Sequence, residues 1–80
     1  MLLEDAIGAE LRAARERQGL TQEALAFRAG VHRTHISLLE RGQRTPTLGV
    51  LFRLCEGMGV DPVEVVRRVR CRSSGGGGQQ

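Results

Sequence analysis

The sequence has no lysine, asparagine, tyrosine or tryptophan, and only two phenylalanines among its 80 residues. All twelve basic residues are arginines, a bias that codon usage in a GC-rich genome can produce, so it carries no functional meaning alone. No apolar run approaches the roughly 18 residues that would span a bilayer. The early acids Glu4 and Asp5 do not suit a signal peptide. We therefore expect a single soluble domain in the cytoplasm, with no membrane partner.

Cysteine is also scarce, which bears on redox chemistry and metal binding. Cys55 and Cys71 are far apart, so we expect Cys55 to be a small buried apolar residue and Cys71 an exposed thiol. His32 and His35 stand three residues apart, a spacing compatible with zinc, but no Cys-x-x-Cys pair accompanies them. We expect no metal and no other cofactor.

Motifs that indicate an enzyme are missing as well. The only glycine-rich stretch is the tail SSGGGGQQ, residues 73–80, which follows no strand and is expected to be flexible. There is no nucleophile–base–acid set, and so short a chain leaves little room for a pocket. The sequence indicates a protein that is not an enzyme. It contains no evident ligand-sensing domain, so we expect control through protein concentration and dimerisation.

The arginines are unevenly distributed along the chain. Residues 1–20 carry three arginines and four acids, whereas residues 21–46 carry four and two, and residues 47–72 carry five and three. The positive excess therefore lies in the middle and at the end of the fold. This distribution suits a surface that binds a polyanion.

The periodicity of apolar residues predicts an all-α chain with no strand. Five helices are expected: four at about 4–18, 22–29, 33–41 and 62–69, and one that follows a cap at Thr47 or Thr45 and runs to about Met58. Thr21 is expected to cap the second, Thr47 or Thr45 the fourth, and Asp61, followed by Pro62, the fifth. Together they form one domain over residues 1–72.

The second and third helices have the spacing of a helix-turn-helix, residues 22–41. Only about three residues join them, so they must cross steeply. Ala26 gives the small residue that a close crossing needs, and Gly30 suits a turn with positive φ. Ile36 and Leu39, one turn apart, pin the third helix to the core.

The segments GLTQEALAFRAGV, RTHISLLERG and PTLGVLFRLCEGMGVDP resemble the small repressors and regulators of the lambda Cro and XRE family over about residues 7–70. Within that family, the size and the stretch HRTHIS are similar to the controller proteins of restriction–modification systems. The resemblance implies a five-helix, lambda-repressor-like domain that binds double-stranded DNA and regulates transcription. Two residues depart from the pattern: His32 replaces the usual Ser, Thr or Asp cap, and His35 stands where many relatives have Tyr.

Opposite the buried side, the third helix has a mixed surface suited to DNA. Its N-terminal half is expected to enter the major groove. Arg33 can donate two hydrogen bonds to a guanine, and Leu38, expected to be exposed, can pack on a thymine methyl. The candidate base-contacting residues are Arg33, Thr34, His35, Ser37 and Leu38.

Phosphate contacts are expected from the ends of these helices and the loop that follows. Gln22 lies at a helix N-terminus, where backbone N–H groups also face outward. The family resemblance supports Gln22, Gln43 and Arg44 in this role. The candidate phosphate-contacting residues are Gln22, His32, Arg41, Gln43 and Arg44.

Glu40 and Arg15 are expected to form a structural ion pair. Glu40 lies near the Ile36–Leu39 side of its helix, so its carboxylate needs a partner inside the fold. Arg15, late in the first helix, is the candidate, and the family resemblance agrees.

The fifth helix has apolar residues in two directions, Val63 with Val66 and Val65 with Val69. One pair suffices to dock the helix, so the other could form a homodimer that reads a near-palindromic operator. We expect Val65 and Val69 at the interface centre, with Phe52 contributing. The alternative function is a protein-interaction module, such as an antitoxin or coactivator, anchored on an exposed Phe27.

Overall fold

The computed structural model describes residues 1–74, and these contain five helices and no strand. The helices are α1 (Leu3–Arg17), α2 (Gln22–Ala29), α3 (Arg33–Glu40), α4 (Leu48–Met58) and α5 (Pro62–Ser74). The all-α expectation is therefore confirmed for this part of the chain. None of these helices is both long enough and apolar enough to cross a membrane.

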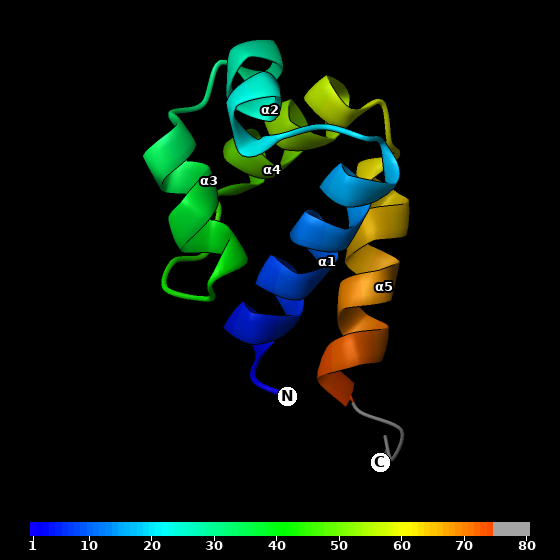
Figure 1. Cartoon of the computed structure of the whole chain (residues 1–80). Coiled ribbons are helices and arrows are strands. Elements are labelled where there is room, and N and C mark those ends of the chain that lie inside the picture. The colour runs from blue at the N-terminus through cyan, green and yellow to red at the C-terminus, as the bar shows by residue number, and fades with distance from the viewer. Residues whose placement is uncertain (75–80) are drawn as a thin grey trace.

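Figure 1 shows α1 and α5 side by side and antiparallel, with the start of α1 and the end of α5 at the same end of the pair. The middle three helices stand over one side of this pair: α3 packs on α1 and on α2, and α2 packs on α4. One apolar core joins all five helices. Its largest fully buried side chains are Ile36, Leu39, Leu54, Met58, Cys55 and, unusually, the carboxylate Glu10.

Three helix starts are fixed by the caps that the sequence indicates. Thr21 Oγ1 accepts a hydrogen bond from the Ala24 N–H at 3.0 Å. Thr47, rather than Thr45, caps α4 by accepting from the Val50 N–H at 3.1 Å. The Asp61 carboxylate accepts from the amide two residues on, at 2.9 Å. Each cap satisfies a backbone donor that the first helical turn leaves without a partner.

The end of α5 was predicted wrongly. The helix continues to Ser74 instead of stopping near Val69, so Ser73 and Ser74 are helical and not part of the tail. Arg72 Nε donates to the buried Glu10 Oε1 at 2.9 Å, which ties the last turns of α5 to α1. Arg17 neutralises the other Glu10 oxygen at 3.1 Å. The rest of the predicted tail, residues 75–80, lies outside the described residues.

Gly8 lets α1 approach the end of α3 closely, a role that the sequence reading missed. A Cβ at this position would lie 2.5 Å from the Leu39 carbonyl oxygen and 2.7 Å from that of Glu40. Both atoms belong to the backbone of α3, so they cannot move aside as a side-chain tip would. The close approach brings the end of α3 onto α1, where Arg15 is found.

The two thiols are expected to react very differently. Cys55 is buried, and burial, helped by the negative charge of Asp61, raises the pKa of its thiol to about 11. At pH 8, a thiol reagent should therefore label only the exposed Cys71 in the native protein. The protonated Cys55 stabilises the fold below the ordinary pKa of 9.0, and this stability is lost as the pH rises through about 11. Mass spectrometry showing rapid double labelling of the native chain would contradict this.

Candidate nucleic-acid interface

The α2–turn–α3 unit has the helix-turn-helix geometry that its spacing indicates. Gly30 ends α2 with φ 67°, in the left-handed region that favours glycine. Val31, in the turn, is buried, as are Ile36 and Leu39 on the inner side of α3. Ala26 is half-buried at the base of the turn and packs against the core. The inner face of α3 is thus fixed, which determines the face it presents outward.

Arg33 and Thr34 are exposed at the start of α3, opposite this buried side. Arg33 Nε lies 3.6 Å from Glu23 Oε2 of α2, and both side chains are more than half exposed. An ion pair of this kind is weak because solvent screens it, so it does not prevent Arg33 from reaching another acceptor. The sequence reading missed this contact.

The remaining candidate base-contacting residues are less accessible than expected. His35, Ser37 and Leu38 are half-buried. The expectation of an exposed Leu38 was therefore wrong, although the residue is not fully buried. The loop after α3 folds back beside it, because the Gln43 N–H donates to the Leu38 carbonyl at 2.9 Å.

His32 is the N-cap of α3, in place of the hydroxyl or carboxylate that more often serves there. Its Nδ1 accepts a hydrogen bond from the Thr34 N–H at 3.1 Å. A neutral imidazole that accepts at Nδ1 carries its hydrogen on Nε2. The exposed ring therefore has one nitrogen that completes the helix start and another that can donate to a ligand.

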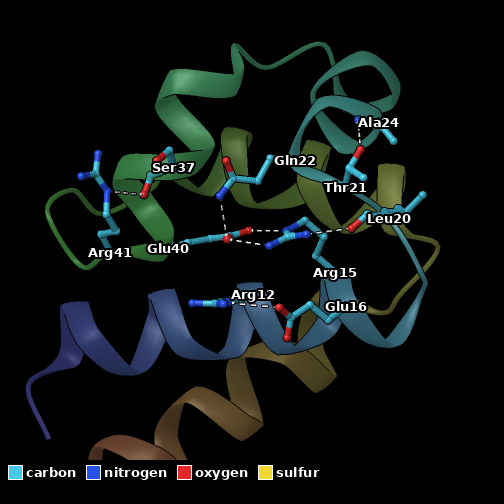
Figure 2. Close-up of polar contacts among 10 residues, drawn as sticks. All are labelled: Arg12, Arg15, Glu16, Leu20, Thr21, Gln22, Ala24, Ser37, Glu40 and Arg41. Carbon is cyan, nitrogen blue, oxygen red and sulfur yellow. Dashed lines mark hydrogen bonds and ion pairs between the residues drawn. The ribbon is translucent and has the colours of Figure 1, made fainter.

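Arg41, Gln43 and Arg44 are exposed together at the far end of α3 and in the following loop. Arg41 Nε donates to the Ser37 carbonyl at 3.3 Å, so this side chain folds back along its own helix (Figure 2). The outer face of α3 is thus flanked by three arginines: Arg33, Arg41 and Arg44. Two exposed acids lie nearby: Glu23 pairs with Arg33, and Asp5 of α1 lies against Gly42 in the loop.

Glu40 forms the predicted ion pair with Arg15, and the structure adds a third member. Arg15 donates from Nε to Glu40 Oε2 at 2.7 Å and from Nη2 to Oε1 at 3.0 Å. The Glu40 side chain is 4% exposed and that of Arg15 is 11% exposed. These hydrogen bonds raise the pKa of Arg15 above its ordinary value. Figure 2 shows Glu40 between Arg15 and Gln22, whose Nε2 donates to Glu40 Oε1 at 3.0 Å.

The predicted centre of a dimer interface was wrong. Val65 and Val69 are 3% and 8% exposed because they dock α5 onto the core. The pair that faces outward is Val63 and Val66, which are 61% and 49% exposed. Phe52, the third predicted residue, is exposed beside them and lines a shallow groove with both.

Exposed apolar residues of α4 and α5 together form a surface that we call the outer apolar face. It is defined by Leu48, Phe52, Val63 and Val66. Val66 also borders a groove of about 220 Å³ between α1, α4 and α5, whose lining includes Leu48. Val65 and Val69 line that groove too, but only as part of the monomer's core. Within residues 1–74, no group of three or more His, Cys, Asp or Glu side chains could hold a metal ion.

Comparison with known proteins places the chain among helix-turn-helix transcriptional regulators. A helix-turn-helix family model, HTH_3, matches residues 11–65. An uncharacterised HTH-type transcriptional regulator of Sinorhizobium fredii, y4dJ, is 40% identical over 60 residues, which cover 75% of this chain and 78% of the relative.

Two solved structures share the fold at appreciable identity. The restriction–modification controller protein C.AhdI of Aeromonas hydrophila is 35% identical with a TM-score of 0.75, covering 78% of this chain and 94% of that one. The clp gene regulator ClgR of Corynebacterium glutamicum is 30% identical with a TM-score of 0.86, covering 92% of this chain and 79% of that one.

Proposed function

Because this chain belongs to the HTH_3 helix-turn-helix family of DNA-binding transcriptional regulators, we propose that it recognises a specific double-stranded DNA sequence by placing α3 in the major groove. The observation that carries the proposal is the split of α3 into two faces. Ile36 and Leu39 hold the helix to the core, while Arg33 and Thr34 are exposed at its N-terminal end. We also propose that it acts in the cytoplasm, where it meets DNA.

Base recognition is assigned to the first two turns of α3. Arg33 carries a planar donor pair that matches the O6 and N7 acceptors of guanine. Thr34 and Ser37 supply hydroxyls, and the accessible edge of Leu38 can cover a thymine methyl. The half-buried His35 completes the set of proposed base-contacting residues.

Phosphate contacts are assigned to both flanks of that helix. On one side, Gln22 stands at the start of α2, where Thr21 caps the Ala24 N–H and leaves the first backbone N–H groups facing outward. His32 adds its Nε2 hydrogen. On the other side, Arg41, Gln43 and Arg44 are exposed. Contacts of this kind position the protein but carry no sequence information themselves.

Replacing Arg33 and replacing Arg44 should have different consequences. Arg33→Ala is expected to lose about 1–3 kcal/mol of discrimination at one base pair, while binding to random duplexes is largely kept. Arg44→Ala should weaken binding to all duplexes alike and reduce the log–log salt slope by about one unit. Fluorescence anisotropy titrations against operator and random DNA at several salt concentrations measure both quantities.

Arg12→Ala serves as the control, since Arg12 lies on α1 in an exposed pair with Glu16. It removes the same charge without touching the proposed surface. If the Arg33 and Arg44 variants had the same profile on the two duplexes, the division between base-reading and phosphate-binding residues would be wrong.

The protein is further proposed to act as a homodimer on a near-palindromic operator, with the outer apolar face as its interface. Exposed apolar residues gathered on one side are typical of a surface that another protein covers. Phe52 supplies an aromatic anchor beside Val63 and Val66. A two-fold dimer would place two α3 helices on half-sites about one helical turn, roughly 34 Å, apart.

A second candidate function, a protein-interaction module, is favoured by Phe27. This side chain is 91% exposed on α2, which is unusual for a residue of its size. Phe27→Ser is expected to leave duplex binding unchanged if DNA recognition is the main function. A chain that binds no duplex, yet captures a protein that Phe27→Ser loses, would favour this second function instead.

A further inference from the structure

We propose that Glu40 is a positioning residue for DNA binding: it fixes the side-chain amide of Gln22 so that one N–H is held inside the protein while the other faces a DNA phosphate. The inference rests on the proposed function and adds a duty to a carboxylate otherwise explained by stability. Its basis is the three-residue cluster Arg15, Gln22 and Glu40, hereafter the Glu40 cluster.

The Glu40 carboxylate is itself buried and hydrogen-bonded through both oxygens. Arg15 holds both of its oxygens with two hydrogen bonds, at 2.7 and 3.0 Å. The same guanidinium donates from Nη1 to the Leu20 carbonyl at 2.7 Å, two residues before α2 begins. Arg15 thus ties the end of α3 to the backbone that leads into α2 (Figure 2). Gln22 therefore hydrogen-bonds to a carboxylate whose position is set by Arg15.

The chemistry of the partners determines how the Gln22 amide is oriented. An ionised carboxylate only accepts hydrogen bonds, so the NH₂ group of Gln22, and not its carbonyl oxygen, must face Glu40. Its Nε2 donates one hydrogen to Glu40 Oε1 at 3.0 Å. The NH₂ group keeps a second hydrogen, and Gln22 is only half-buried, so that donor is available at the surface.

This second donor lies where a phosphate would also meet the free backbone N–H groups at the start of α2. A glutamine that is already ordered loses less conformational entropy on binding than a mobile one. Gln43 offers the contrast, because it is exposed in the loop and its side chain makes no hydrogen bond to residues 1–74 in the structure. Glu40 should therefore strengthen the contribution of Gln22 and leave that of Gln43 unchanged.

A double-mutant cycle tests the inference on the full chain, with duplex affinity measured at one salt concentration and a temperature at which circular dichroism shows every variant folded. In the parent, Gln22→Ala is expected to weaken binding about tenfold, the size typical of a hydrogen bond to a charged group. In the Glu40→Gln background, the same change should weaken binding less than twofold. A glutamine at position 40 offers one acceptor oxygen instead of two, and Arg15 competes for it.

Gln43→Ala is the matched control and should weaken binding equally in both backgrounds. Equal losses from Gln22→Ala in the two backgrounds would overturn the inference, as would an unchanged affinity of Gln22→Ala in the parent. A parent chain that binds no duplex would refute the proposed function, and the inference with it, before any variant is compared.

A measurement on the free parent protein avoids any variant that fails to fold. The side-chain ¹⁵N relaxation of Gln22 should be that of a rigid group, whereas Gln43 should show fast internal motion. If the two glutamine amides were equally mobile, the positioning role of Glu40 would be excluded.

Discussion

Glu40→Ala is expected to lower the free energy of unfolding by about 3–5 kcal/mol, the range for breaking one side of a buried ion pair. The variant leaves the Arg15 guanidinium, 11% exposed, without the two hydrogen bonds that neutralise it. For a small domain whose total stability is about 5–15 kcal/mol, this is a large fraction. Thermal and urea unfolding followed by circular dichroism measure the loss.

The exposed pair of Arg12 and Glu16 provides the control, because both side chains are more than half exposed. Glu16→Ala should cost about 0–1 kcal/mol. The double variant Arg15→Met/Glu40→Leu should be more stable than either single variant, since apolar groups of similar volume replace the pair without leaving a charge behind. A Glu40→Ala protein as stable as Glu16→Ala would refute the structural role of the pair.

Val63→Asp/Val66→Asp is expected to convert a dimer into a monomer and to weaken operator binding by about 10²–10⁴-fold. Two carboxylates in the outer apolar face would have to lose water at a dimer interface, which is costly. A monomer binds one half-site alone. In a dimer, binding of the first subunit holds the second subunit at a high effective concentration near its own half-site. Analytical ultracentrifugation at tens of micromolar, together with operator titrations, measures both effects.

The control must carry the same added charge, because two acids weaken DNA binding by themselves. Gln18→Asp/Ser74→Asp meets this need, since both residues are exposed and lie outside the outer apolar face. It should remain dimeric and lose far less affinity. A parent chain that stays monomeric at these concentrations would remove the dimer proposal, with no consequence for α3 as the reading helix.

Local signals in the sequence were sufficient for most of the fold. Thr21, Thr47 and Asp61 begin their helices through side chains that bind the backbone two or three residues on. Gly30 ends α2 in the left-handed conformation. Such interactions depend on near neighbours in the chain, so their residue types are informative without any tertiary structure. The Arg15–Glu40 pair was the exception, because the family resemblance supported a contact between distant helices.

The features that were missed depend on how whole helices dock. The two valine pairs of α5 look equivalent in sequence, and the packing of α5 against α1 selects Val65 and Val69 for the core. One signal was present in the sequence. Arg72 follows Val69 by three residues, so it lies on the same side of α5 as Val65 and Val69. Its partner Glu10 is an acid on the buried side of α1. An acid at such a position needs a cation from another helix, which would have indicated the docked face and the longer α5.

The candidate site was predictable in outline but not in detail. The outward direction of α3 follows from Ile36 and Leu39, and the structure confirms that these two residues are buried. Leu38 is half-buried although it lies away from the inner side of α3, and the ring orientation of His32 depends on its cap. Neither arrangement follows from helical periodicity, which gives an angle around the helix axis but not the position of neighbouring segments.

The central claim is that α3 reads the sequence of double-stranded DNA, and selection of bound duplexes from a randomised pool, at a stated salt concentration, tests it most directly. The account predicts enrichment of two inverted half-sites whose centres lie about one helical turn apart. Selection with Arg33→Ala should lose preference at one symmetry-related position in each half-site and retain the others. A parent chain that enriches no sequence over the starting pool, while folded by circular dichroism, would contradict the claim.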